Sequence, residues 1–238
     1  RTVVNIVNHM DRTGFKQVLV LGSACGPYLE TIRKDVKTVD LRKRRVRGAV
    51  VPLANQILSW KPEVVFSPYP DANVALMLAM KMTRWQGCTV LRESNHRTAE
   101  GVEWGFAKHH LVRWAYRQAT RVVALSNGVR QDLIRRYGLL PGRVQTIYNP
   151  VDLDMISRMA AEHPPGIEEF QVKANGKVKI TAVGRRVRQK VFDILIKAIS
   201  RIEEEPVHVT ILGEGVERER LVALARTLGI QNLISMPG

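Results

Sequence analysis

The chain has 238 residues, of which 45% are apolar, and its formal net charge is +15. This length allows one large domain or two small ones, and the apolar fraction suffices for a hydrophobic core, which excludes a disordered chain. The sequence contains no run of about 18 apolar residues, so it predicts no transmembrane helix. Cys25 and Cys88 lie far apart without metal-ligand or redox spacing, so we expect reduced thiols in a cytoplasmic protein.

In the first part of the chain, short apolar runs alternate with longer amphipathic runs. The expected strands are residues 18–21, 36–41, 63–67, 89–92, 121–125 and 144–148. The expected helices are residues 3–10, a short one from Pro27, 49–60, 73–82, 106–118, and one that Ser126 caps and Gly138 ends. Strands separated by helices form a parallel sheet covered on both faces, so this part predicts a Rossmann-like α/β domain.

After residue 150 the pattern is interrupted and then restarts. Asn149 and Pro150 form a rigid extended pair that suits a domain exit, and residues 162–176 are rich in proline and glycine. A second series follows, with strands at 177–183, 207–212 and 233–235 and helices from Phe192 and at 217–227. The sequence therefore predicts a first domain at 1–150, a hinge at 151–176 and a partial second domain at 177–238.

A basic turn follows the first strand of the second domain, which we expect to be buried. Gly184 breaks the strand, and Arg185, Arg186, Arg188 and Lys190 precede the helix that begins at Phe192. Cations are disfavoured by about 0.3–1 kcal/mol each at a helix start, because that end carries partial positive charge. A bound anion would reverse the sign of this effect, so the turn indicates a phosphate site. The alternative is a solvated basic turn.

A second glycine turn, Gly213, Glu214 and Gly215, ends the next strand. Parallel sheets bind ligands at the carboxyl ends of their strands, so two neighbouring strands would deliver both turns to one crevice. That arrangement suits a nucleotide diphosphate. Neither turn matches the dinucleotide fingerprint or the lysine-terminated P-loop.

Three stretches carry a family resemblance: VVALSNGVRQDLIRRYGLLPGRVQTIYNPVD at 122–152, VGRRVRQKVFDILIKAI at 183–199 and VTILGEGVERERLVALARTLGI at 209–230. In this order and spacing they resemble the retaining glycosyltransferases of family 4, which have the GT-B fold of two Rossmann-like domains. The resemblance implies a donor sugar linked to UDP or GDP, no required cofactor, and an interdomain hinge at the I-Y-N-P-V-D stretch.

The resemblance also assigns site residues. The family's basic turn holds the donor diphosphate, and Arg185 and Lys190 match its two cations, while Gly213, Glu214 and Gly215 match its donor loop. Two departures stand beside these matches: the family's usual leucine is Arg186 here, and its usual glycine is Val191. The resemblance further implies a chain truncated at both ends, with both domains incomplete, and an engineered or reconstructed origin is one explanation.

Catalytic candidates follow the fourth expected strand. A family histidine commonly approaches the reacting centre from this place, and the corresponding segment carries Glu93 and His96. An imidazole there could hydrogen-bond sugar hydroxyls, and Glu93 could orient the substrate or the histidine. The alternative is that His96 is a polar loop residue and Glu93 pairs with Arg92 or Arg97. His109 and His110 fall within an expected helix as structural or surface groups, and no spacing suggests a metal site.

The densest positive charge is a basic segment that we define as Arg42, Lys43, Arg44, Arg45 and Arg47. It could meet an anionic membrane surface, which would suit a lipid-linked acceptor, or it could be a solvated loop. A nucleic-acid partner would rest on charge alone, because no nucleic-acid motif accompanies the segment. Exposed sheet edges would favour a homodimer. Two functions remain open: a sugar transferase, peripheral to the membrane, or a nucleotide-binding scaffold with little activity.

Overall fold

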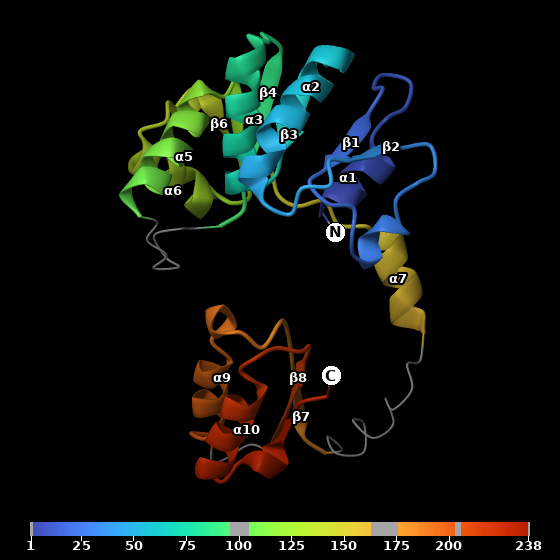
Figure 1. Cartoon of the computed structure of the whole chain (residues 1–238). Helices are drawn as coiled ribbons and strands as arrows, with labels where there is room; N and C mark the ends of the chain where they lie inside the picture. Colours follow the sequence, from blue (N-terminus) through green and yellow to red (C-terminus); the bar gives the residue numbers. More distant parts are fainter. Residues whose placement is uncertain (1, 96–104, 163–175, 203–205, 238) are drawn as a thin grey trace. The chain divides into compact units, whose positions relative to one another are not determined.

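The chain divides into two compact units, Arg1–Asp152 and Leu153–Gly238 (Figure 1). Each unit has its own hydrophobic core and its own parallel strands. This computed structural model describes residues 2–95, 105–162, 176–202 and 206–237.

The first unit alternates helices with short parallel strands. Its principal elements are α1 (Thr2–His9), β1 (Val18–Leu21), β2 (Lys37–Asp40), α2 (Val50–Trp60), β3 (Val64–Ser67), α3 (Pro70–Thr83), β4 (Cys88–Glu93), α5 (Phe106–Gln118), β5 (Arg121–Ala124), α6 (Asn127–Tyr137) and β6 (Val144–Thr146). β1 and β2 form one parallel pair, and β3-β4-β5-β6 form a four-stranded sheet in chain order, also parallel. The predicted α/β architecture is confirmed.

The core of the first unit lies where α2, α3, α5 and α6 pack with the four-stranded sheet. Leu76, Leu91, Tyr116 and Leu133 come from four different elements and are 2% exposed or less. The two predicted ends of α6 are confirmed: the Ser126 hydroxyl accepts a hydrogen bond from the Val129 N–H at 3.2 Å, and Gly138 terminates the helix at φ 63°. These caps satisfy backbone groups that the helix itself leaves unpaired.

The second unit contains one three-stranded parallel sheet in the order β7-β8-β9. Its principal elements are α7 (Leu153–Ala161), β7 (Val178–Val183), α9 (Phe192–Ile199), β8 (Val207–Leu212), α10 (Arg218–Thr227) and β9 (Ile234–Ser235). Its core comes mainly from α9, β8 and α10, and Ile196, Val209, Ile211 and Leu221 are at most 2% exposed. α7 lies within the residues expected to form the hinge, where no helix was predicted.

The expectation that β7 is buried was wrong. Val178 and Val183 are 51% and 73% exposed, and the intervening Ile180 and Ala182 are only partly buried. β7 lies at the edge of its sheet in the described chain, whereas the central strand β8 is almost wholly buried. An apolar run therefore marked a strand correctly, but its burial depends on what packs against each face and edge.

Candidate functional site

The two glycine turns meet at the carboxyl ends of β7 and β8. The Gly184 N–H donates to the Leu212 carbonyl at 3.0 Å, and the Arg186 N–H donates to the Glu214 carbonyl at 2.8 Å. In return, the Arg186 carbonyl accepts from the Glu217 N–H at 3.0 Å. Three backbone hydrogen bonds thus join the two turns, and the predicted neighbourhood of β7 and β8 is confirmed.

Glycine is required at two points where the turns touch. Gly213 has φ 111°, and a Cβ atom there would lie 2.5 Å from the Gly184 carbonyl oxygen. A Cβ atom on Gly215 would collide with the Arg186 carbonyl group. At both positions the added Cβ atom would lie closer to a backbone carbonyl than Cβ atoms do in real proteins. Any residue larger than glycine would therefore force the two turns apart.

The cations of the basic turn stand just before a helix start, as the sequence predicts. Arg185 and Lys190 are exposed, and the Lys190 side-chain carbons Cδ and Cε lie 3.5 Å from where a Gly184 Cβ would be. A 3₁₀ turn at Arg188–Lys190 leads to Val191, which has φ 46° and ψ 37°. α9 begins at the next residue with no side-chain cap. The Lys190 stem therefore covers Gly184 beside an uncapped helix N-terminus, a place suited to an anion.

Arg186 departs from the prediction that all four cations face the same anion. Its side chain is completely buried and donates from Nη2 to the carbonyls of Ile211, at 2.9 Å, and of Pro237. Nη1 approaches a Glu214 carboxylate oxygen at 3.4 Å. Burial fits the family's usual apolar residue at this position, and the guanidinium finds polar partners inside the unit.

Glu93, a candidate catalytic residue, lies at the carboxyl end of β4 and is 1% exposed. One carboxylate oxygen accepts the N–H groups of Ser94 and Asn95, at 2.9 and 3.0 Å, and the other accepts the Tyr116 hydroxyl at 2.8 Å. Burial, with Glu93 beside it, raises the pKa of Tyr116 well above its ordinary value. Glu93 thus holds the backbone of Ser94 and Asn95, which lead toward His96. His96 itself lies outside the described residues.

A second polar residue connects this network to α3. Asn73 is fully buried, and its Nδ2 donates to the Arg92 carbonyl at 3.2 Å and approaches the Tyr116 hydroxyl at 3.4 Å. The Arg92 guanidinium donates to the Asn149 side chain at 2.8 Å and to the Pro68 carbonyl at 3.3 Å. Arg92, one of the two alternative partners named for Glu93, is therefore hydrogen-bonded to these two groups, and the other, Arg97, lies outside the described residues. Asn73 and Tyr116 are buried residues of α3 and α5. The sequence carries no signal that distinguishes them, as partners of this polar network, from the other residues of these helices.

His109 and His110, which the sequence places in a helix as structural or surface groups, lie on α5. The His109 ring lies 5.4 Å from the Tyr137 ring and 5.7 Å from the His110 ring, measured between centroids. Burial, and then the nearby cations, lowers the pKa of His109. Among the residues that the structure describes, no group of three or more His, Cys, Asp or Glu is arranged to hold a metal ion.

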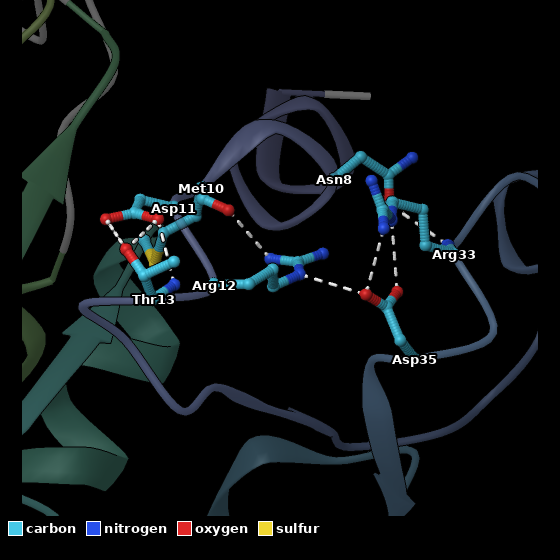
Figure 2. A network of polar contacts seen from close by, with 7 residues as sticks. All are labelled: Asn8, Met10, Asp11, Arg12, Thr13, Arg33 and Asp35. Atoms are coloured by element: carbon cyan, nitrogen blue, oxygen red, sulfur yellow. Dashed lines mark hydrogen bonds and ion pairs between the residues drawn. The ribbon is translucent and has the colours of Figure 1, made fainter.

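The basic segment follows β2 and is exposed at all five cations. Just before β2, Asp35 lies between two arginines: Arg33 Nη2 and Arg12 Nε are 3.0 and 3.1 Å from Asp35 Oδ2 (Figure 2). Hydrogen bonds from Arg33 and then Arg12 lower the pKa of Asp35 to about 2. Across the described parts of the chain, by contrast, no side-chain ion pair involves the basic segment.

Comparison with known families decides the classification. Residues 1–155 match the model of Glycosyltransferase Family 4, and residues 166–238 match that of Glycosyl transferases group 1. The chain belongs to glycosyltransferase family 4. In this family 4 chain, both glycine turns lie within the group 1 match, and Glu93 and the basic segment lie within the other.

Relatives and solved structures support the same fold. An enzyme of Campylobacter jejuni named N-acetylgalactosamine-N,N'-diacetylbacillosaminyl-diphospho-undecaprenol 4-alpha-N-acetylgalactosaminyltransferase is 28% identical over 128 residues, 54% of this chain and 32% of that enzyme. HepE of Anabaena, solved in complex with UDP, superposes with a TM-score of 0.76 at 16% identity, covering 100% of this chain and 64% of HepE. The lipopolysaccharide outer core galactosyltransferase WaaB gives a TM-score of 0.69 at 15% identity, with 100% and 63% covered.

These neighbours confirm the GT-B-like α/β fold of the family 4 chain. The chain spans about a third of the Campylobacter enzyme and less than two thirds of HepE and WaaB. No helix in the described ranges is both long and apolar enough to cross a bilayer.

Proposed function

We propose that the chain transfers a sugar from a nucleotide-diphosphate donor to an acceptor hydroxyl, with retention of the anomeric configuration. The observation that carries this proposal is the junction of the two glycine turns beside the uncapped start of α9, in a chain of family 4. The UDP named with the HepE structure supports a UDP-linked donor, and a GDP-linked donor is the other candidate.

The donor diphosphate would bind at this junction, on the turn residues Gly184, Gly213, Glu214 and Gly215, with Arg185 and Lys190 as its cations. Both cationic side chains are exposed, and Lys190 already lies over Gly184. Negative charge grows on the leaving diphosphate as the glycosidic bond breaks. Cations and backbone N–H groups fixed at that place stabilise the transition state more than the ground state.

On the acceptor side, we propose roles for His96 and Glu93. His96 would hydrogen-bond a sugar hydroxyl near the reacting centre. Glu93, which accepts three hydrogen bonds with little exposure, would act as a positioning residue for the segment that leads to His96. His96→Ala would then lower kcat with little change in UDP affinity, whereas a surface loop residue would leave kcat unaltered.

The donor assignment is tested by calorimetric titration of UDP and GDP into the wild-type chain and the Arg185→Ala/Lys190→Ala double variant. Loss of two charge-assisted contacts predicts at least a hundredfold weaker binding, or about 3 kcal/mol. Lys179→Ala/Arg226→Ala is the matched control, because it removes two exposed cations from the same unit. Unchanged affinity in the first variant, or equal weakening in both, would refute the assignment.

We propose a lipid-linked acceptor at an anionic membrane surface. The name of the Campylobacter relative contains a diphospho-undecaprenol, and the basic segment of this chain exposes all five of its cations. Each cation near an anionic surface contributes about 1 kcal/mol. Vesicles with phosphatidylglycerol should therefore co-sediment the wild-type chain, but much less of a variant with Arg42, Lys43 and Arg44 changed to Ser. Equal sedimentation with purely zwitterionic vesicles would contradict this part.

Catalysis itself is separated from nucleotide binding by a transfer assay. Incubation with nucleotide sugars and a polyprenyl-diphosphate sugar should release the nucleoside diphosphate and yield a product whose anomeric configuration matches the donor, seen by NMR. Binding of UDP without transfer or donor hydrolysis would instead establish the second candidate, a nucleotide-binding scaffold.

A further inference from the structure

Arg186 occupies an unusual place for a charged residue. Among the described residues it is the largest side chain that is fully buried. Its main chain is held on both sides, since its N–H donates to the Glu214 carbonyl and its own carbonyl accepts from the Glu217 N–H. The backbone of Arg186 therefore joins the turn after β7 to the Gly213–Gly215 turn, and its buried guanidinium points away from solvent.

The guanidinium links the carboxyl ends of all three strands of the second unit. Carbonyl groups alternate sides along a strand, and the Leu212 carbonyl accepts from Gly184 on the β7 side, so the Ile211 carbonyl faces β9. On that side the chain continues from β9 to Pro237, which has no N–H to donate. Arg186 Nη2 donates to the Ile211 carbonyl at 2.9 Å and also to the Pro237 carbonyl. One side chain from the turn after β7 thus replaces the missing backbone donor.

The same guanidinium shares a carboxylate with a second arginine. Glu214 Oε2 lies 3.4 Å from Arg186 Nη1, and Glu214 Oε1 lies 2.7 Å from Arg218 Nη1. Burial, and then Arg218, lowers the pKa of Arg186, while Glu214 raises it; the guanidinium nevertheless stays charged. These three residues carry a net charge of +1. Arg218 is the first residue of the adjoining helix α10, which brings its guanidinium next to the Glu214 carboxylate.

We propose that Arg186 is a positioning residue of the donor turn, which holds the Glu214 carboxylate as its counter-ion and so keeps that negative charge off the bound diphosphate. The inference rests on the proposed function. It assigns Glu214 a different role from direct donor contact: the turn's backbone meets the diphosphate, and its carboxylate balances Arg186 and Arg218. Arg186 also holds the Gly213–Gly215 turn against β9 through its two carbonyl contacts.

A double-mutant cycle on UDP affinity tests this role. Glu214→Gln removes the negative charge and should tighten UDP binding by about threefold, whereas loss of a donor ligand would weaken it about tenfold or more. Arg186→Leu places the family's apolar residue at the same site. It should weaken binding about tenfold, because the carboxylate loses one of its two holders. When Glu214→Gln is already present, Arg186→Leu should weaken binding by only about threefold, since no carboxylate remains to be released.

Two further variants separate positioning from charge and from folding. Arg186→Lys keeps the charge but cannot bond two carbonyls and a carboxylate as a planar fork, so it should not restore wild-type affinity. Arg201→Leu removes an exposed arginine of the same unit and should leave affinity unchanged. Circular dichroism verifies that each variant is folded, and if Arg186→Leu does not fold, the Glu214→Gln titration decides alone.

The outcomes distinguish this inference from the proposed function. Weaker UDP binding by Glu214→Gln, wild-type affinity in a folded Arg186→Leu, or strictly additive effects in the cycle would each overturn the inference while the donor site stands. If the wild-type chain binds neither UDP nor GDP, the proposed donor site itself fails, and the role of Arg186 fails with it.

Discussion

Val191 is a residue where the structure predicts that glycine stabilises the fold more than alanine does. It stands between Lys190 and the first residue of α9 with φ 46° and ψ 37°, in the left-handed region that β-branched residues avoid. The family's usual residue at this position is glycine, which reaches this conformation without steric conflict. We therefore compare Val191→Gly with Val191→Ala, because both substitutions remove the same half-exposed isopropyl group.

The expected difference has two opposing terms. A side chain in the left-handed region costs about 1–2 kcal/mol, a cost that glycine avoids and alanine keeps. Glycine in turn gives the unfolded chain more freedom, which favours the alanine variant by about 0.4–1 kcal/mol. Val191→Gly should therefore be more stable than Val191→Ala by roughly 0.5–1 kcal/mol, the reverse of the usual order of these two residues.

Urea unfolding monitored by far-ultraviolet circular dichroism measures this difference. Tryptophan fluorescence is unsuitable, because every Trp and Tyr of the sequence precedes residue 149, outside the second unit. Hydrogen exchange of the α9 amides gives a local measure. Ala223→Gly on the exposed face of α10 is the control and should destabilise by about 1 kcal/mol. If Val191→Gly is less stable than Val191→Ala, backbone strain at this residue is negligible and the reasoning fails.

Two further predictions concern the first unit. Tyr116→Phe removes one hydrogen bond from the buried Glu93 carboxylate and should lower the free energy of unfolding by roughly 1–3 kcal/mol. The control Tyr148→Phe, at an exposed ring, should leave the free energy of unfolding unchanged. Equal melting temperatures of both variants and the wild type would count against a structural role for the network. Asp35 has its pKa lowered to about 2 from 3.8, so its contribution to stability is present above pH 4 and is lost as the pH falls through 2. Asp35→Asn should thus melt below the wild type at pH 7, with the gap closing between pH 4 and 2; a gap of constant size would show that the carboxylate charge plays no part.

Local patterns predicted much of the fold because local interactions determine it. The expected bounds of α5 and β8 agree with the structure, since an amphipathic repeat and a dense β-branched run are unambiguous signals. The caps of α6 were predicted from single residues, because Ser126 and Gly138 satisfy backbone groups within their own turn. Parallel pairing of β7 with β8 followed from the helix between them.

Tertiary contacts account for what the sequence did not reveal. Arg186 was grouped with the anion-facing cations because neighbouring residues of a turn have no periodic pattern that tells inside from outside. The one available signal was the apolar residue usual at that family position, which indicates a side chain pointing inward. The partners of Glu93 were hidden for the same reason, because Tyr116 lies more than 20 residues along the chain in another element.

The close approach of the two glycine turns also limits how this part of the protein can vary. Gly213 and Gly215 are fixed by the space available to their own backbones, whereas the residue between them has a side chain that is 60% exposed. In a library randomised at these three codons, survivors should therefore keep both glycines, while the middle codon should favour residues that can still accept a contact from the buried Arg186, wherever folding is the selected trait. The flanking pair of glycines thus sets the distance between the strand ends, and any change of their size would move the two turns apart.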